Sequence, residues 1–188
     1  IGTEKSELEK LDLEGMKKAY NWVFDNLDKE ITIENIEQIN LWVGVVGKRI
    51  HYAGSIRVTI PMDNKGVLVY SGGHRYIGAE AGSNGKNLVD DLEKLLEYVK
   101  TIPAPYKGFA YSAKATLMQY FKDGNKRTAR LVQDWMNAKE GYLPISLATE
   151  EAKIKYEKAL TELFYKEDAK EYIKFFTEQY AKQQRLYR

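Results

Sequence analysis

The segment Phe121-Lys-Asp-Gly-Asn-Lys-Arg-Thr-Ala-Arg130 places a short polar break between two stretches of helical periodicity. The break is Asp123-Gly124-Asn125, and these residue types favour tight turns. Apolar residues recur at helical spacing on both sides of the break, so the sequence predicts a helix, a loop and a second helix. The periodic residues are Ala110, Ala113, Leu117 and Phe121 before the break, and Leu131, Val132, Trp135 and Met136 after it.

This arrangement has the chemistry of a phosphate site. A helix that begins directly after the loop presents free backbone N–H groups, and its dipole favours an anion there. Gly124 allows a positive φ and lets the backbone approach a ligand closely. Arg127 and Arg130 lie on nearly the same helix face, where guanidinium groups can fork onto phosphate oxygens. Asp123, at the loop mouth, suits Mg²⁺ that bridges phosphates. The alternative is an ordinary Asp-Gly-Asn turn that caps a helix.

Most of the remaining sequence also predicts helix, which gives an all-α fold of about seven helices in a single domain spanning residues 1–188. Polar and turn-forming residues separate these helices, and Thr149 is the expected cap of the sixth. We find no internal repeat and no linker. The other helices are expected around residues 16–27, 32–43, 88–99, 150–164 and 172–180.

The exception to the helical pattern lies between residues 56 and 78, where the period changes to two. Ile56, Val58 and Ile60 alternate with polar residues, and a shorter alternation follows at residues 67–69. Because residues 61–66 between them have turn chemistry, the sequence predicts a small β-hairpin with its turn there. Glycines at residues 71–78 predict a loop after the hairpin.

Composition excludes several classes of protein. The chain has 29 basic and 27 acidic residues, a net charge of +2, so it does not call for a nucleic-acid partner. No apolar run approaches the roughly 18 residues of a spanning helix, so we expect no membrane partner and a cytoplasmic location. There is no cysteine and there are only two histidines, which excludes thiolate and histidine-rich metal sites. The oligomeric state stays open.

The segment resembles the motif of the Fic (Fic/Doc, Fido) family, H-x-F-x-[DE]-G-N-[GK]-R-x-x-R. Seven positions match, and Gln119 stands where the motif has histidine. Residues 56–78 resemble the family's flap hairpin, which holds the target segment and here includes Gly72, Gly73 and His74. Ile77-Gly-Ala-Glu80 stands where the flap usually has prolines. The matching positions are Phe121, Asp123, Gly124, Asn125, Lys126, Arg127 and Arg130.

The resemblance implies a protein adenylyltransferase that moves AMP from ATP to a Ser, Thr or Tyr hydroxyl of a target protein, with Mg²⁺. Asp123 would hold the metal, and Phe121 would pack beneath the loop. Arg127 would hold the α- and β-phosphates, and Arg130 would hold the γ-phosphate. Gly124, Asn125 and Lys126 would complete the nucleotide-binding residues.

Gln119 is the departure that matters for catalysis. A glutamine amide cannot accept a proton at neutral pH, and loss of a general base typically costs ~10²–10⁴ in rate. Three explanations stay open: a natural pseudoenzyme, phosphoryl transfer that rests on positioning, or an introduced change. His74 in the flap is a candidate replacement base, against a solvated loop histidine. A non-catalytic module that binds a nucleotide or a protein is therefore the competing function.

The N-terminal helical region, residues 1–28, contains a degenerate inhibitory motif. Many Fic proteins carry [ST]-x-x-x-E-[GN], whose Glu pairs with the second motif arginine and blocks the γ-phosphate. Here Glu14 and Gly15 match, but Lys10 replaces the hydroxyl residue. We therefore expect Glu14 to contact Arg130, with Asp12 as the less favoured candidate and a plain surface glutamate as the alternative.

Overall fold

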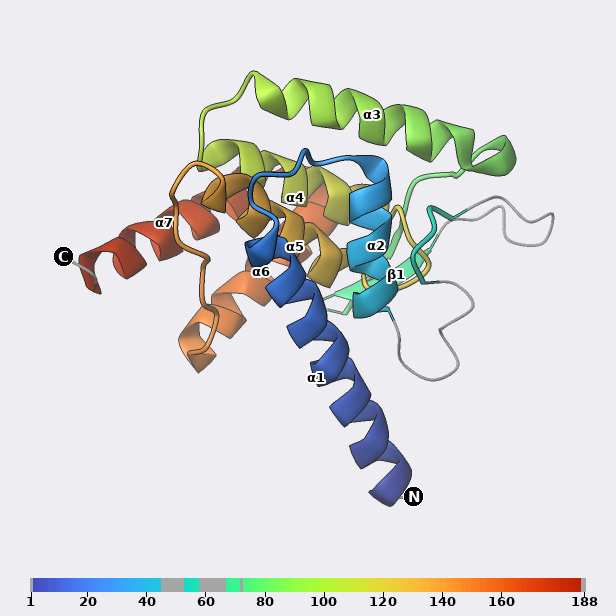
Figure 1. Cartoon of the computed structure of the whole chain (residues 1–188), viewed down its shortest axis with the longest axis horizontal. Coiled ribbons are helices and arrows are strands. Elements are labelled where there is room, and N and C mark those ends of the chain that lie inside the picture. Colours follow the sequence, from blue (N-terminus) through green and yellow to red (C-terminus); the bar gives the residue numbers. More distant parts are fainter. Residues whose placement is uncertain (1, 45–52, 58–66, 72, 187–188) are drawn as a thin grey trace.

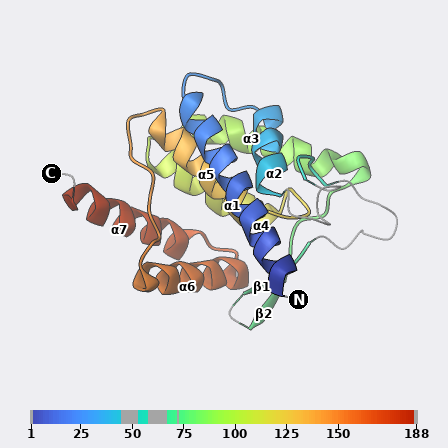
Figure 2. The same ribbon diagram turned by 60° about the horizontal axis from the view of Figure 1, so that its bottom comes forward.

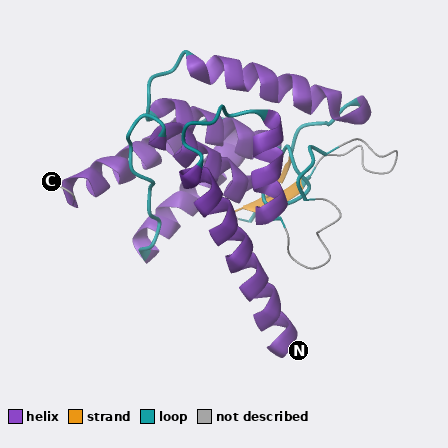
Figure 3. Cartoon of the chain, in the orientation of Figure 1, coloured by secondary structure: helices purple, strands orange, loops and turns teal. Residues whose placement is uncertain are grey.

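The protein is described by a computed structural model that covers residues 2–44, 53–57, 67–71 and 73–186. Seven α-helices and one two-stranded sheet make up this described part, and helix dominates it (Figure 3). The predicted all-α fold with a small hairpin is therefore confirmed. The elements are α1 (Gly2–Asp25), α2 (Ile33–Val43), β1 (Leu68–Ser71), β2 (His74–Ile77), the short 3₁₀ helix η2 (Ser83–Gly85), α3 (Lys86–Lys100), α4 (Tyr106–Met118), α5 (Asn125–Ala138), α6 (Glu150–Lys166) and α7 (Lys170–Leu186).

Two hydrophobic clusters flank α4, the helix that precedes the polar break. The first joins α1, α2, α3 and α5, and the fully buried Trp135 is its largest side chain. The second joins α6, α7 and the inner face of the hairpin, around Phe109 and Phe176. Since α4 and α5 pack against each other between these clusters, the loop that connects them is held on a rigid base.

Helix α1 crosses α5, and its N-terminal part extends beyond the body of the molecule (Figures 1 and 2). Gly15 permits the close approach of α1 to α2, because a Cβ there would lie 2.3 Å from the Trp42 carbonyl oxygen. The helix begins well before Met16, where the apolar periodicity first predicts it. The earlier residues whose burial is described are exposed or half-buried, so hydrophobic spacing could not reveal these turns.

Side-chain caps fix two helix starts. Thr32 accepts a hydrogen bond from the Asn35 amide at 3.3 Å, and Thr149 accepts one from the Ala152 amide at 3.2 Å. Each satisfies one of the amides that a helix leaves unpaired in its first turn. The cap predicted at Thr149 is therefore confirmed.

The hairpin pairs residues later in the chain than the sequence predicted. Leu68 pairs with Ile77 and Ser71 pairs with His74, so only residues 72 and 73 connect the strands. Gly73 has a φ of +80°, as two-residue hairpin turns require. The turn predicted at residues 61–66 lies outside the described residues, as does most of the strand predicted at 56–60. The segment predicted as a loop after the hairpin contains β2, because the Gly-Gly pair is itself a hairpin turn.

Candidate functional site

The polar break forms a loop that leads directly into α5, as predicted. Helix α4 ends at Met118, and Gln119 follows it in the left-handed region at φ 53°, ψ 57°. Gly124, at φ 74°, is the residue before the first turn of α5. Phe121 was predicted within the preceding helix, but it lies in the loop, where its side chain is only 2% exposed. It packs beneath the loop, as the motif resemblance implied.

The Asn125 side chain closes the loop from inside. Its carbonyl oxygen accepts from the Phe121 amide at 2.8 Å, and its amide donates to the Phe121 carbonyl at 2.7 Å. This reciprocal pair fixes the spacing of residues 121–125. The side chain of Asn125 is therefore committed to shaping the loop, and only its backbone can face a ligand.

Asn40, on α2, holds the same loop from the other side. It is fully buried, and its amide donates to the Asp123 carbonyl at 2.9 Å and to the Thr128 hydroxyl at 3.0 Å. Its own carbonyl oxygen accepts from the Gly54 amide at 3.0 Å. Sequence reasoning missed Asn40, although a polar residue on the apolar face of α2 was the available signal.

Gly124 is required for two reasons at once. Its positive φ is costly for any other residue type. A Cβ at this position would also lie 3.0 Å from Val43 Cγ1 and 3.2 Å from the Asn40 amide nitrogen. The loop therefore fits closely against α2, which directs the first turn of α5 outward.

Gly124 at the start of α5 provides no side-chain cap for the helix. Thr128 is the residue whose amide bonds back to Gly124, at 2.8 Å. Among the described residues, no side-chain bond caps this helix start. Helix N–H groups in this position attract anions, and the α5 dipole adds to the attraction. Lys126 is exposed beside them.

Arg127 lies between two carboxylates. Its guanidinium donates to Asp12 of α1 and lies 3.6 Å from the carboxylate of Asp123. All three side chains are about one-third exposed, at 30%, 39% and 34% for Arg127, Asp12 and Asp123. The structure thus brings the predicted Asp123 and Arg127 together, and it adds a carboxylate from the N-terminal helix.

Gln119 turns inward, away from the loop mouth. It is 4% exposed, and its amide donates to the Thr116 carbonyl at 2.5 Å. Gly78, just after β2, packs directly on it, because a Cβ on Gly78 would lie 2.6 Å from Gln119 Cβ. The flap therefore contacts the position of the motif histidine.

A buried arginine, which sequence reasoning missed, connects the flap segment to the end of α4. Arg57, 5% exposed, donates through its guanidinium to the carbonyls of Gln119, Ala79 and Met118, the last at 3.0 Å. Its backbone amide bonds to the Tyr120 carbonyl at 2.9 Å. A cation suits the C-terminal carbonyls of a helix, so Arg57 joins both ends of the flap segment to the end of α4.

The described chain has no helix that is both long and apolar enough to cross a bilayer. No protein-family model and no curated protein sequence matches the chain. Solved structures do match it. Fic-1 from C. elegans (residues 134–508) superposes with a TM-score of 0.70 at 21% identity, over 93% of this chain. A Fic family protein from Desulfovibrio desulfuricans G20 gives 0.66 at 18% identity over 90%.

This chain has the Fic fold. A Fic-domain signalling protein from Bacteroides thetaiotaomicron VPI-5482 agrees, with a TM-score of 0.63 at 16% identity over 92% of the chain. The chain spans about half of the length of the first two of these proteins and 66% of the third. At such identities the likeness establishes the architecture, and function must be argued from the site.

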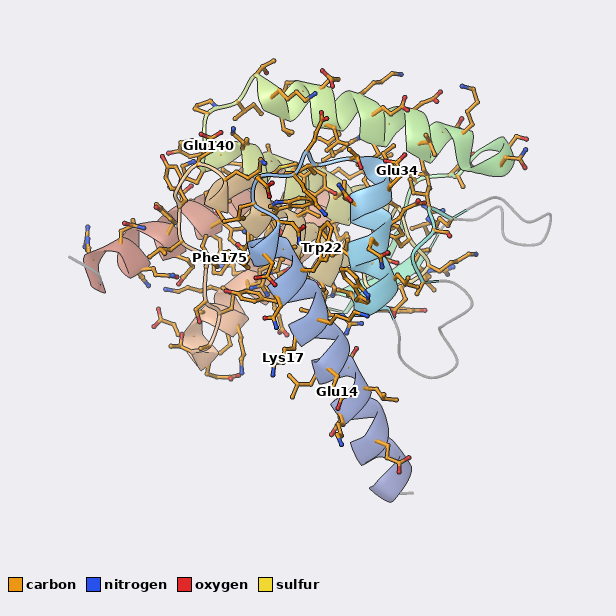
Figure 4. The ribbon with its side chains drawn as sticks, viewed as in Figure 1. Glu14, Lys17, Trp22, Glu34, Glu140 and Phe175 are labelled. Atoms are coloured by element: carbon orange, nitrogen blue, oxygen red, sulfur yellow. The ribbon has the colours of Figure 1, made fainter. Side chains whose placement is uncertain are left out.

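Within the Fic fold, the predicted contact between Glu14 and Arg130 is absent from the described residues. Glu14 is exposed and lines a surface hollow with Lys17 and other α1 residues, on the extended part of the helix (Figure 4). Asp12 takes the place beside the motif instead, but it contacts Arg127. Asp12 is three residues before Gly15, on the face that α1 turns inward, whereas Glu14 lies two residues after Asp12 and so about 160° around the helix from it.

The remaining flap residues lie on or near the hairpin turn. The ring centre of His74 lies 5.1 Å from that of Tyr165 on α6, and the imidazole is exposed. Gly73 has open space around it, and Gly72 lies outside the described residues. Within the described part of the chain, no group of three or more His, Asp or Glu side chains is arranged to hold a metal. Any metal here would depend on Asp123 together with ligand oxygens.

Proposed function

We propose that this chain is a member of the Fic family that binds the phosphates of ATP at the start of α5 and transfers AMP poorly because of Gln119. The observation that carries the proposal is the uncapped first turn of α5, which follows Gly124 and has Asp123 and Arg127 beside it. Helix N–H groups and a guanidinium together form a favourable site for a phosphate.

The donor set at the loop mouth fits a phosphate-bound Mg²⁺. Mg²⁺ commonly takes one or two protein carboxylates and fills its other positions with water and phosphate oxygens. Asp123, one-third exposed and adjacent to Arg127, supplies one such carboxylate. When bound, the metal would neutralise phosphate charge.

The proposed reaction needs a proton acceptor that the chain lacks at position 119. In AMP transfer a hydroxyl oxygen of the target protein attacks the α-phosphorus, the bond to pyrophosphate breaks, and the hydroxyl proton must leave. The Gln119 amide cannot take that proton, and it is turned toward Thr116. Phosphate binding does not depend on this base, so binding persists while transfer is slowed by about 10²–10⁴.

The Asp12 contact would regulate binding in this proposal. A phosphate that approaches Arg127 must compete with the Asp12 carboxylate. Because the pair is partly exposed, it is worth about 0–1 kcal/mol, so it would weaken binding by no more than about fivefold. Helix α1 thus replaces the predicted Glu14–Arg130 contact with a milder one at the first motif arginine.

Calorimetry with Mg-ATP, paired with a transfer assay that uses ATP labelled at the α-phosphate, tests the proposal. We expect the parent chain to bind ATP with little transfer, and Gln119→His to raise transfer by at least about 100-fold. Arg127→Ala should abolish binding, while the matched control Lys158→Ala, at an exposed position on α6, should not change it. A parent chain that does not bind ATP would refute the proposal. Binding without any transfer in Gln119→His would favour a nucleotide-binding module.

A further inference from the structure

Arg127 is paired with carboxylates, but Arg130 contacts an aromatic ring. Within the described chain Arg130 makes no ion pair with any carboxylate. Its guanidinium carbon lies 5.4 Å from the ring centre of Tyr156 on α6. An arginine stacked on an aromatic face gains attraction from the ring and keeps its N–H groups available for an anion.

Asp134 interacts with the charge of Arg130 but forms no ion pair with it in the described part of the chain. Asp134 lies one turn later on α5, and the charge of Arg130 lowers the pKa of its carboxyl group. Burial acts in the opposite direction and dominates, so the pKa of Asp134 rises to about 6. Arg130, which is always protonated, therefore contacts the Tyr156 ring and has no carboxylate paired with it among the described residues.

The contact depends on the ring of Tyr156 and not on its hydroxyl. Among the described residues, the buried Tyr156 hydroxyl has no hydrogen-bond partner, and neither do Arg130 Nε and the hydroxyls of Thr116 and Tyr172. Ring contacts hold Tyr156 in place instead, with centre-to-centre distances of 5.7 Å to Phe175 and 5.9 Å to Phe176. The side chain is thus a fixed aromatic surface beneath the guanidinium.

We infer that Tyr156 is a positioning residue that holds Arg130 ready for the terminal phosphate of a nucleoside triphosphate, an inference that rests on the proposed function. A free arginine side chain loses rotamer freedom when a ligand orders it. The Tyr156 ring restricts the guanidinium before the ligand arrives, which lowers that loss. Arg127 is nearer the start of α5, so it would hold the inner phosphates and leave the terminal phosphate to Arg130. Tyr156 would therefore affect the affinity for a triphosphate more than the affinity for a diphosphate.

The test compares ATP and ADP affinities, measured with Mg²⁺ by calorimetry, in the full chain. Tyr156→Leu removes the ring face and should raise the Kd for ATP about 3–30-fold, the range of a cation–π contact, with less than a twofold change for ADP. Tyr156→Phe keeps the ring and should leave both constants within about twofold. Tyr165→Leu is the matched control on the same helix, because its ring is exposed and faces His74.

A double-mutant cycle separates positioning from general loosening of the fold. In an Arg130→Met background, Tyr156→Leu should no longer change the ratio of ATP to ADP affinity. If Tyr156→Leu does not fold, Tyr156→Met takes its place, because it also removes the ring and its unbranched side chain adapts better to the space left. If the parent binds ATP but Tyr156→Leu leaves the ratio of ATP to ADP affinity unchanged, this inference alone is overturned. The same holds if Tyr156→Leu changes the ratio equally in the parent and in the Arg130→Met background. A parent that binds neither nucleotide contradicts the proposed function as well.

Discussion

Replacing Asn40 with alanine should both destabilise the protein and loosen its candidate site. The substitution removes three hydrogen bonds of 2.9–3.0 Å, a buried one to Thr128 and partly buried ones to Asp123 and Gly54. At about 1 kcal/mol for each bond, with a further cost for the groups left unpaired, the free energy of unfolding should fall by about 3–4 kcal/mol. For a chain of this length that corresponds to a melting temperature lower by about 8–12 °C.

Urea unfolding gives the free-energy change, and calorimetry with Mg-ATP gives the effect on the site. We expect the Kd for ATP to rise about tenfold, because the Asp123 carbonyl loses the donor that fixes the loop. Asn21→Ala, an exposed position on α1, is the matched control and should cost less than about 0.5 kcal/mol. Asn40→Asp keeps the acceptor for Gly54 but loses both donors, so it should be at least as harmful. A loss below about 1 kcal/mol with unchanged ATP affinity would show that other contacts hold the loop.

Three further predictions concern groups in contact with the motif or close to it. Asp134→Asn should stabilise the protein by about 2–3 kcal/mol at pH 7.5. Burial raises the pKa of Asp134 to about 6, so the parent loses stability as the pH rises from about 4 through about 6. Urea titrations at pH 4 should therefore show no gain in the variant. Gly78→Val should displace Gln119, which its Cβ would approach to 2.6 Å, and the Gln119 side-chain amide signals in an NMR spectrum should shift. Asp12→Asn should tighten ATP binding up to about fivefold at low salt, and a change that persists unreduced in 0.5 M salt would contradict an exposed ion pair.

Patterns that repeat along the chain were sufficient to predict the helices and the loop at the motif. The start of α5 was predictable because Asp-Gly-Asn interrupts two apolar periodicities, and each helix buries one face. The hairpin register was not, because β-branched residues at 56–60 drew the strand assignment away from the Gly-Gly turn. The four-residue strands at 68–71 and 74–77 carry too little alternation to outweigh that signal.

Contacts between distant segments were beyond sequence reasoning. The rotation of α1 about its axis determines which of its carboxylates contacts a motif arginine. Gly15 fixes that rotation by facing Trp42, and this places Asp12 inward and Glu14 outward. Arg57 reads in sequence as a polar residue on a strand, yet it serves the carbonyls at the end of α4. Nothing local to residues 12 or 57 indicates these partners.

The parts that shape the loop are separate from the residue that would perform proton transfer. Asn125 and Asn40 fix the loop through its backbone, and Arg57 fixes the end of α4 through carbonyl oxygens. None of these bonds uses the side chain of Gln119. The left-handed backbone at Gln119 is also one that histidine adopts more readily than most residues. A histidine at position 119 would therefore meet an intact loop, and recovery of transfer would depend on whether its ring leaves the Thr116 carbonyl for the loop mouth.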